Sequence, residues 1–207
     1  MSKYEDWQEC NSETFWCDVG SCSHVVQLYE SEDALLSLLE DFVAGGVTAE
    51  DCVIIIATEE HLYALEQRLR NYGLDVNKLC ATDQYIPLDA HKTLSKFMVQ
   101  DRLDREQFLE AVNEMFDRVH ATGRKMRAFG EMVAVLWQQG NRTGTMLLEQ
   151  YWNELFEKEA FPLLCAYPYD LFPADANSAL SAICQAHSKL VRHSEASRFD
   201  LAYLDVT

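Results

Sequence analysis

Apolar residues along the chain follow two alternating patterns. Short apolar runs rich in β-branched residues are typical of strands, and the continuous run at 51–57 is typical of a strand covered on both faces. Longer segments with apolar residues three and four positions apart are typical of helices that bury one face. The patterns predict strands at 24–29, 51–57, 78–82, 84–88, 126–130 and 161–167. They predict helices at 32–44, 59–72, 90–98, 105–120, 131–139, 143–160 and 174–191.

The ends of the predicted helices carry residues that suit helix boundaries. Side chains that can cap a first turn precede several of them, namely Ser31, Thr58, Asp89 and Asp104. Glycines follow predicted helix ends at positions 45–46, 73, 123 and 140. The alternation of strand and helix predicts an α/β fold, with a mostly parallel central sheet flanked by helices on both faces.

The chain is predicted to form one α/β domain over residues 24–190. Its 207 residues are enough to bury a full core without disulfides or metals. Residues 1–23 form an acidic appendage that also carries Trp7, Phe15 and Trp16, and residues 191–207 form a C-terminal tail. The three large aromatic side chains favour docking of the appendage on the domain or on a second copy of the chain, although a flexible leader is an open alternative.

Charge and composition exclude several classes of partner. The formal net charge of −17 and the pI near 4.6 argue against nucleic acid and anionic lipid, which proteins bind through Lys and Arg clusters. No apolar run approaches the roughly 20 residues of a membrane span, and the first residues are too charged for a signal peptide. We therefore expect a cytoplasmic protein without a membrane partner, whose seven scattered cysteines are mostly thiols.

The sequence also lacks the common catalytic motifs of α/β proteins. A phosphate-binding loop needs glycines and a Lys after the first strand, but 29–33 (YESED) has neither and contributes three acids. No G-x-S-x-G elbow is present. We therefore expect a non-catalytic protein with no catalytic residues and no cofactor.

Glu131 is the first candidate for a ligand contact. It follows the strand at 126–130, and in open α/β sheets ligands bind beyond the carboxyl ends of the strands. Glu149 and Asn153 lie one helical turn apart and could face the same crevice, or solvent. A structural role for Glu131 is equally open.

Metal binding is the weaker interpretation of the cysteines and histidines. Cys184 and His187 are three positions apart on a predicted helix and so share a face. A structural zinc site needs four ligands, and no second Cys/His pair matches this one, so we expect no metal. His24, at the start of the first strand, is typical of a packed residue.

Several short motifs occur in an order that resembles one known family, the MEDS domain (methanogen/methylotroph, DcmR-type sensory domain), over about residues 24–190. The motifs are His24-Val-Val-Gln-Leu-Tyr29, Ala57-Thr58-x-x-His61, Leu88-Asp89-Ala90, Phe129-Gly130-Glu131-Met132, Leu136-Trp137, Leu148-Glu149-x-x-x-Asn153, Leu164-Cys165-Ala166-Tyr167 and Ile183-Cys184-x-x-His187. The resemblance implies a degenerate relative of the RecA/KaiC-like ATPases without a P-loop, which serves as a sensor of small organic molecules.

The resemblance also implies which residues form the ligand site. The candidates are His24, Tyr29, His61, Glu131, Glu149, Asn153, Cys165, Tyr167 and His187. Because no kinase or DNA-binding segment is evident, the domain is expected to signal in trans to a histidine kinase or transcription regulator. Fold-level analogy leaves a homo-oligomer open. The alternatives are a ligand-free protein-interaction adaptor and an enzyme that uses Glu131 as a base.

Overall fold

The computed structural model describes residues 8–10, 24–159, 161–172, 177–194 and 198–203. The predictions about Trp7, Phe15 and Trp16 lie outside the described residues.

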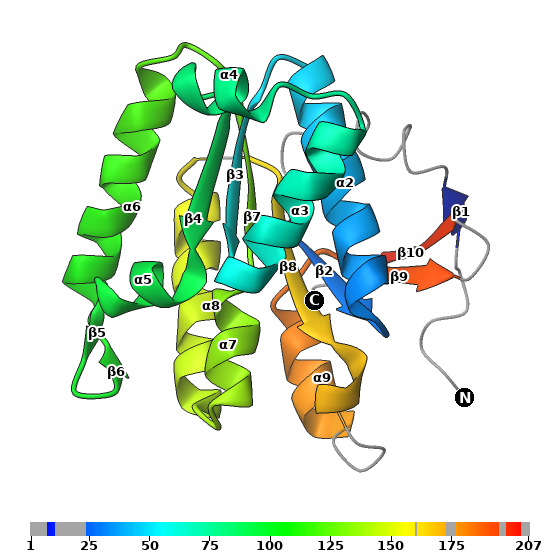
Figure 1. Cartoon of the computed structure of the whole chain (residues 1–207). Helices are drawn as coiled ribbons and strands as arrows, with labels where there is room; N and C mark the ends of the chain where they lie inside the picture. The colour runs from blue at the N-terminus through cyan, green and yellow to red at the C-terminus, as the bar shows by residue number, and fades with distance from the viewer. Residues whose placement is uncertain (1–7, 11–23, 160, 173–176, 195–197, 204–207) are drawn as a thin grey trace.

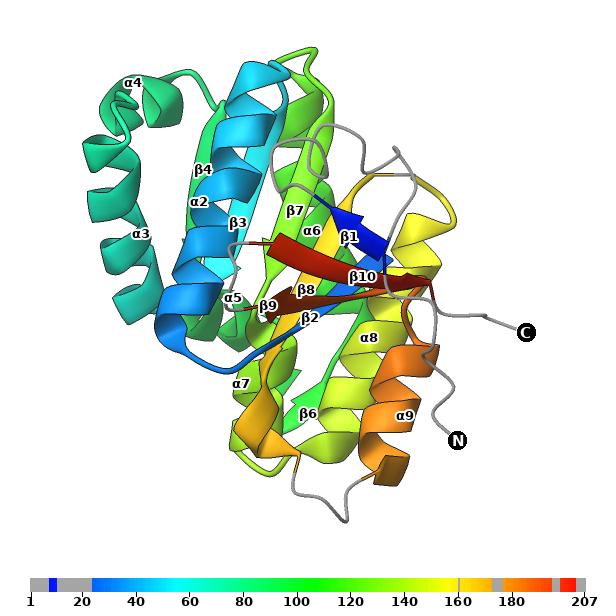
Figure 2. The ribbon, with the colours of Figure 1, turned by 90° about the vertical axis from the view of Figure 1, so that its right-hand side faces the viewer.

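The centre of the molecule is a sheet with the strand order β1-β10-β9-β2-β8-β7-β3-β4 (Figure 1). The strands from β9 to β4 pair in parallel, whereas β10 and β1 add antiparallel pairs beyond β9 (Figure 2). The parallel strands are β2 (His24–Tyr29), β3 (Cys52–Ala57), β4 (Tyr85–Asp89), β7 (Met126–Gly130), β8 (Leu163–Pro168) and β9 (Lys189–Ser194). The antiparallel strands are β1 (Gln8–Cys10) and β10 (Arg198–Tyr203).

Helices cover both faces of the sheet. One face is covered by α2 (Glu32–Thr48), α3 (Glu59–Asn71) and α4 (Val76–Ala81). The other is covered by α5 (Ala90–Ser95), α6 (Arg105–His120), α7 (Met132–Gln138), α8 (Arg142–Phe156) and α9 (Asn177–Gln185).

In the part of the chain that the structure describes, no helix has the length and apolar character needed to cross a membrane. The predicted α/β class is confirmed, while kinship with RecA and KaiC stays a prediction.

Strand β8 shows how the sequence assigns side chains to the two faces. Leu164 and Ala166 belong to the core beneath α2 and α3, whereas Cys165 and Tyr167 belong to the core beneath α7 and α8. This alternation follows from the two-residue period of a strand.

The helix caps predicted at 31, 58, 89 and 104 are all confirmed, because each side chain accepts a hydrogen bond from a first-turn N–H.

The predicted strand at 78–82 is wrong, because this segment forms the end of α4. Asp75 caps that helix by accepting a hydrogen bond from the Lys78 N–H at 3.1 Å. Val76 and Leu79, three positions apart, then bury the same face. The predicted helix at 90–98 is too long, because α5 ends at Ser95. The chain then forms a short hairpin of β5 (Met98–Val99) and β6 (Arg102–Leu103).

Helix α2 does not stop at Gly45 and Gly46 as predicted, but continues to Thr48. A Cβ atom at Gly46 would lie 2.3 Å from Cγ2 of Val53 and 2.9 Å from Cδ of Arg127. Gly46 therefore allows close contact between the helix and the sheet, rather than ending the helix.

The predicted helix at 174–191 is also too long. Helix α9 ends at Gln185, and Lys189–Ser194 forms β9, which pairs with β2 and crosses the predicted boundary at 190. Residues of the predicted tail form β10, which pairs with β9. These strands satisfy the backbone groups along an edge of β2 that would otherwise be open. A short 3₁₀ turn at Tyr169–Leu171 follows β8.

Candidate functional site

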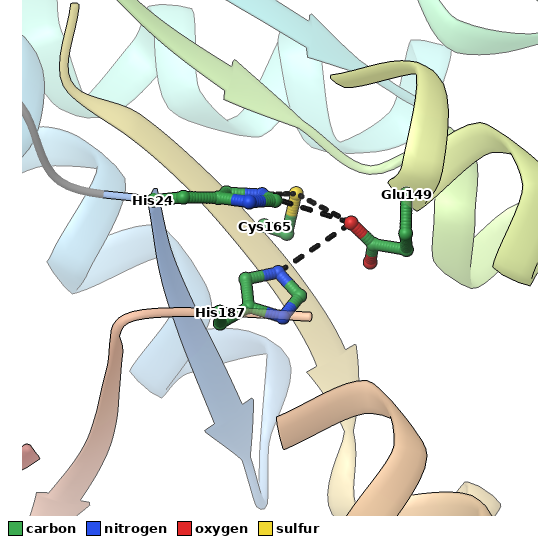
Figure 3. A group of neighbouring side chains, drawn as sticks. All are labelled: His24, Glu149, Cys165 and His187. Carbon is green, nitrogen blue, oxygen red and sulfur yellow. Dashed lines mark hydrogen bonds and ion pairs between the residues drawn. The ribbon is translucent and has the colours of Figure 1, made fainter. Parts of the chain in front are cut away.

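Four side chains that can bind metals or share protons meet on the α8 side of the sheet (Figure 3). They are His24, Glu149, Cys165 and His187, and we call them the buried tetrad. Each is at most 2% exposed. One ligand atom from each residue lies within 4.8 Å of the corresponding atoms of the other three.

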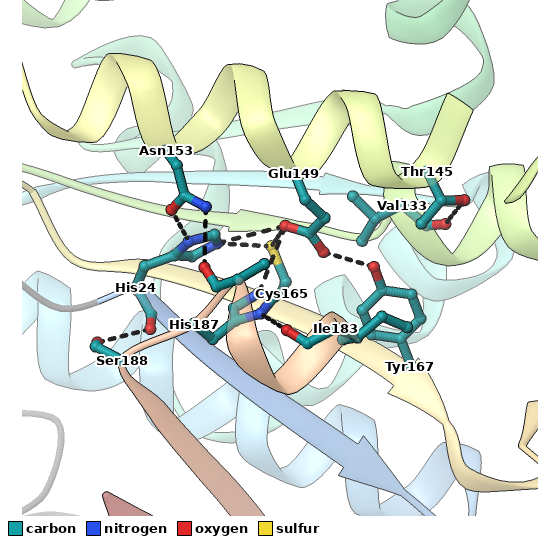
Figure 4. A network of polar contacts seen from close by, with 11 residues as sticks. His24, Val133, Thr145, Glu149, Asn153, Cys165, Tyr167, Ile183, His187 and Ser188 are labelled. Atoms are coloured by element: carbon teal, nitrogen blue, oxygen red, sulfur yellow. Dashed lines mark hydrogen bonds and ion pairs between the residues drawn. The ribbon is translucent and has the colours of Figure 1, made fainter. Parts of the chain in front are cut away.

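The fold brings the buried tetrad together from four separate elements. His24 begins β2 and Cys165 lies in β8, and the parallel register pairs Val26 with Cys165. Glu149 and the neighbouring Asn153 project from α8, which lies over this face of the sheet (Figure 4). His187 lies in the short connection between α9 and β9.

The carboxylate of Glu149 lies at the centre of the tetrad. Its Oε2 atom is 3.6 Å from Nε2 of His24 and 3.5 Å from Nε2 of His187. Cys165 Sγ lies 3.8 Å from the same oxygen and 3.4 Å from Nε2 of His24. The other carboxylate oxygen, Oε1, accepts a hydrogen bond from the Tyr167 hydroxyl at 2.5 Å.

Both imidazole rings are oriented by hydrogen bonds on their outer side. Asn153 donates from Nδ2 to the Ala186 carbonyl at 3.0 Å, so its Oδ1 is left to accept from Nδ1 of His24 at 2.8 Å. Nδ1 of His187 donates to the Ile183 carbonyl at 2.7 Å. In both rings the proton is therefore on Nδ1, and Nε2 presents a lone pair to the centre of the tetrad.

Burial favours the uncharged forms of these groups. Removal from water lowers the pKa of His24 to about 3 and that of His187 to about 4. It raises the pKa values of Glu149, Cys165 and Tyr167. In the described part of the chain, no Lys or Arg forms an ion pair with Glu149, so no fixed cation offsets its burial.

Glu131 belongs to a second group, at the carboxyl end of β7. Its Oε2 accepts a hydrogen bond from the Thr58 N–H at 3.0 Å, and Nδ1 of His61 lies 2.8 Å from Oε1. This carboxylate therefore ties the start of α3 to the start of α7. Tyr29, at the carboxyl end of β2, lies close enough to Glu131 that the negative charge adds to burial in raising the pKa of the phenol. The sequence suggested that Glu131, Glu149 and Asn153 could face one crevice. In the structure, Glu131 shares no contact partner with Glu149 or Asn153.

Replacing His61 with Asn should reduce stability more at low pH than at high pH. The hydrogen bond to Glu131 raises the pKa of His61 above its usual 6.5, so protonated His61 stabilises the folded state. This contribution is complete below pH 6.5 and is lost as the pH rises through the folded-state pKa. Denaturant unfolding should show that His61→Asn costs about 1–3 kcal/mol at low pH and less at high pH. The exposed His91 provides a control, His91→Asn, with little effect at either pH. A cost that grows with pH would contradict the assignment.

A cavity of about 710 Å³ lies along β4, the edge strand of the sheet. Its walls come from α3, α4, β4, α5 and α6, with Ile56 from β3, Met132 from α7 and Trp152 from α8. None of the nine predicted site residues lines it. No sequence pattern indicates this cavity, because apolar residues on helix faces have the same spacing whether they border a cavity or a filled core.

The nine predicted residues thus separate into two groups. His24, Glu149, Asn153, Cys165, Tyr167 and His187 share one buried network, and Tyr29, His61 and Glu131 lie at the carboxyl edge of the sheet. From sequence, only Cys184 and His187 were expected to share a face as possible metal ligands. In the structure, His187 instead meets three ligand residues from other elements.

Comparison with known proteins identifies the family of this chain. No protein with a curated description matches the chain. Residues 23–188, well over half of the chain, match the family described as MEDS: MEthanogen/methylotroph, DcmR Sensory domain. The chain therefore belongs to the MEDS family of sensory domains.

Proposed function

We propose that this sensory domain is non-catalytic and binds a small, mostly apolar organic molecule in the cavity along β4. It then signals in trans, in the cytoplasm, to a histidine kinase or transcription regulator. The observation that supports this proposal is the cavity itself. Its volume of about 710 Å³ lies within the range of small-molecule sites, roughly 300–1,000 Å³.

The chemistry of the cavity walls indicates the class of ligand. Six apolar side chains, from α3, β4, α6, α8 and the turn after α5, contribute to the lining: Leu62, Ile86, Phe97, Val112, Met115 and Trp152. Asp89 and Thr93 add polar groups near the carboxyl end of β4, and charged side chains also border the cavity, namely Glu59, Glu66, Lys92, Lys96, Glu114 and Arg118. A ligand with an apolar body and one or two polar atoms would gain from burial of the body and keep its polar atoms hydrogen-bonded.

The contact between Glu131 and His61 offers a route from the cavity to the rest of the domain. Leu62 and Met132, each next in sequence to one of these residues, line the cavity. A ligand that binds more tightly to one separation of α3 and α7 would shift the population of that arrangement. The carboxylate and the imidazole would then act as a coupling contact, not as the ligand site.

A cavity-filling substitution tests the proposal. Ala111 lines the cavity from α6, so Ala111→Phe should place a ring inside it. In a thermal-shift screen of alcohols, ketones and aromatic hydrocarbons, a ligand at about 100 times its Kd should stabilise the wild-type chain by about 2.7 kcal/mol. Ala111→Phe should lose this stabilisation and remain folded.

The exposed Ala121 at the end of the same helix provides a matched control. Ala121→Phe makes the same chemical change outside the cavity and should respond to ligand like the wild type. A screen in which no compound stabilises the wild type, or a ligand that stabilises Ala111→Phe equally well, would contradict the proposal.

A further inference from the structure

One nitrogen of the buried tetrad has no hydrogen-bond partner. Nε2 of His187 is fully buried and makes no hydrogen bond, although it lies 3.5 Å from Oε2 of Glu149. The Nδ1 proton is donated to Ile183, so this Nε2 carries a lone pair directed into the tetrad. A buried lone pair without a partner costs free energy, and a metal ion is one group that can accept it.

The spacing of the four ligand atoms fits a tetrahedral metal site. Bonds of about 2.0–2.3 Å from Zn²⁺ to nitrogen, oxygen and sulfur give tetrahedron edges of about 3.3–3.8 Å. The distances from Nε2 of His24 to Cys165 Sγ and to Oε2 of Glu149 are 3.4 and 3.6 Å. The distances from the same oxygen to Nε2 of His187 and to Cys165 Sγ are 3.5 and 3.8 Å. These four distances are those of tetrahedron edges, and the two remaining separations, from Nε2 of His187 to Nε2 of His24 and to Cys165 Sγ, are within 4.8 Å.

The outer hydrogen bonds match those that orient metal ligands. In metal sites, a ligating histidine donates its other N–H to a carbonyl or carboxylate oxygen, and a ligating carboxylate is itself hydrogen-bonded. Here His24 donates to Asn153, His187 donates to Ile183, and Tyr167 donates to Oε1 of Glu149. These bonds leave Nε2 of His24, Nε2 of His187 and Oε2 of Glu149 directed toward a common centre (Figure 4).

We propose that the buried tetrad binds one Zn²⁺ ion through His24 Nε2, Glu149 Oε2, Cys165 Sγ and His187 Nε2. Nitrogen, sulfur and carboxylate ligands in a tetrahedral set favour Zn²⁺ over Mg²⁺ or Ca²⁺. Binding displaces the thiol proton of Cys165, and any proton on Glu149, to solvent. The thiolate and the carboxylate then balance the charge of the ion inside the core.

The proposed ion has a structural or regulatory role. Four protein ligands close the coordination sphere, and a catalytic zinc site would keep a position for water or substrate. His187 lies between α9 and β9. By binding it together with Glu149, His24 and Cys165, the ion would link this connection to α8, β2 and β8. Metal loading would thereby control whether α9 is held on the sheet. This role is separate from ligand binding in the cavity along β4.

Metal analysis of the full chain tests the proposal directly. The protein is treated with a chelator under reducing conditions, and Zn²⁺ or Co²⁺ is then added. Elemental analysis should find one Zn²⁺ per chain, with a rise in the melting temperature. Co²⁺ should give the absorption bands of a tetrahedral site and a thiolate-to-cobalt charge-transfer band.

Two cysteine variants separate ligand loss from loss of packing. Cys165→Ala should lose the charge-transfer band and stoichiometric Zn²⁺. Cys184→Ala removes another buried thiol, from the neighbouring helix, and should keep both. Asn153→Ala keeps all four ligands but removes the group that orients His24, together with its hydrogen bond to the Ala186 carbonyl, and should weaken Zn²⁺ binding by roughly 10–100-fold.

Absence of stoichiometric Zn²⁺ or Co²⁺ from the wild-type chain would overturn the proposal. So would a charge-transfer band that persists in Cys165→Ala or disappears in Cys184→Ala. If Cys165→Ala does not fold, the wild-type cobalt spectrum and the affinity of Asn153→Ala still decide the question. Neither measurement depends on a small-molecule ligand, so failure here leaves the proposed sensing function standing.

Discussion

Replacing Asp51 with Ala should lower the free energy of unfolding by about 3–5 kcal/mol. Asp51 accepts hydrogen bonds on Oδ2 from Nε of Arg127 at 2.9 Å and from its Nη2 at 2.5 Å. Both residues are buried, and the guanidinium also lies 5.6 Å from the centre of the Phe42 ring. The variant would leave a buried cation without its carboxylate, and urea unfolding would measure the loss.

A double variant separates two contributions to the lost free energy of unfolding: the cost of a buried Arg127 that has lost Asp51, and the stabilisation by the ion pair itself. Asp51→Leu combined with Arg127→Met removes both charges, and should recover most of the stability lost by Asp51→Ala. The exposed pair of Arg105 and Glu154, at 2.7 Å, provides the control, because Glu154→Ala should cost about 1 kcal/mol or less. Equal losses in the buried and exposed pairs would contradict the argument.

Phe108→Ala should also cost about 3–5 kcal/mol, because it empties a fully buried position. The Phe108 ring packs edge-on against Phe97 at 5.2 Å and Trp152 at 5.4 Å, measured between ring centres. The Tyr151 ring is tilted by 36° relative to Phe108, with its centre 5.2 Å away. The substitution therefore removes aromatic contacts as well as apolar burial.

Thermal and denaturant unfolding of a short series would test this expectation. Phe108→Leu keeps most of the buried volume and should cost much less than Phe108→Ala. Gln107→Ala changes an exposed neighbour on the same helix and should alter stability by no more than about 0.5 kcal/mol. Since Phe97 and Trp152 line the cavity along β4, Phe108→Ala should also weaken any ligand response. A loss no larger than that of Gln107→Ala would show that the aromatic contacts contribute little.

Local patterns predicted the elements whose boundaries are set by neighbouring residues. The strand at 126–130 and the caps at Thr58 and Asp104 depend on short segments, and they were predicted correctly. Gly46 was misread, because a glycine that ends a helix and a glycine that allows close packing look the same in sequence. Strand β9 was missed because pairing with β2, not local preference, decides its conformation.

The candidate site was predictable by residue but not by arrangement. The spacing of Glu149 and Asn153 correctly placed both on one face of a helix. It could not show that this face meets His24 and Cys165 instead of the crevice near Glu131. The partners come from distant segments, and only the packing of α8 on the sheet determines which of them meet.

The origin of the buried tetrad from distant segments has a kinetic consequence. His24 and Cys165 are 141 positions apart, and His24 and Asn153 are 129 apart. Contacts between such distant positions form slowly, because closing a long loop costs entropy before any contact repays it. A folding intermediate that contains the helices but lacks the pairing of β2 with β8 cannot assemble the tetrad. The tetrad can therefore form only after β2 has paired with β8, and its contacts report that these strands, α8 and the connection after α9 have come together.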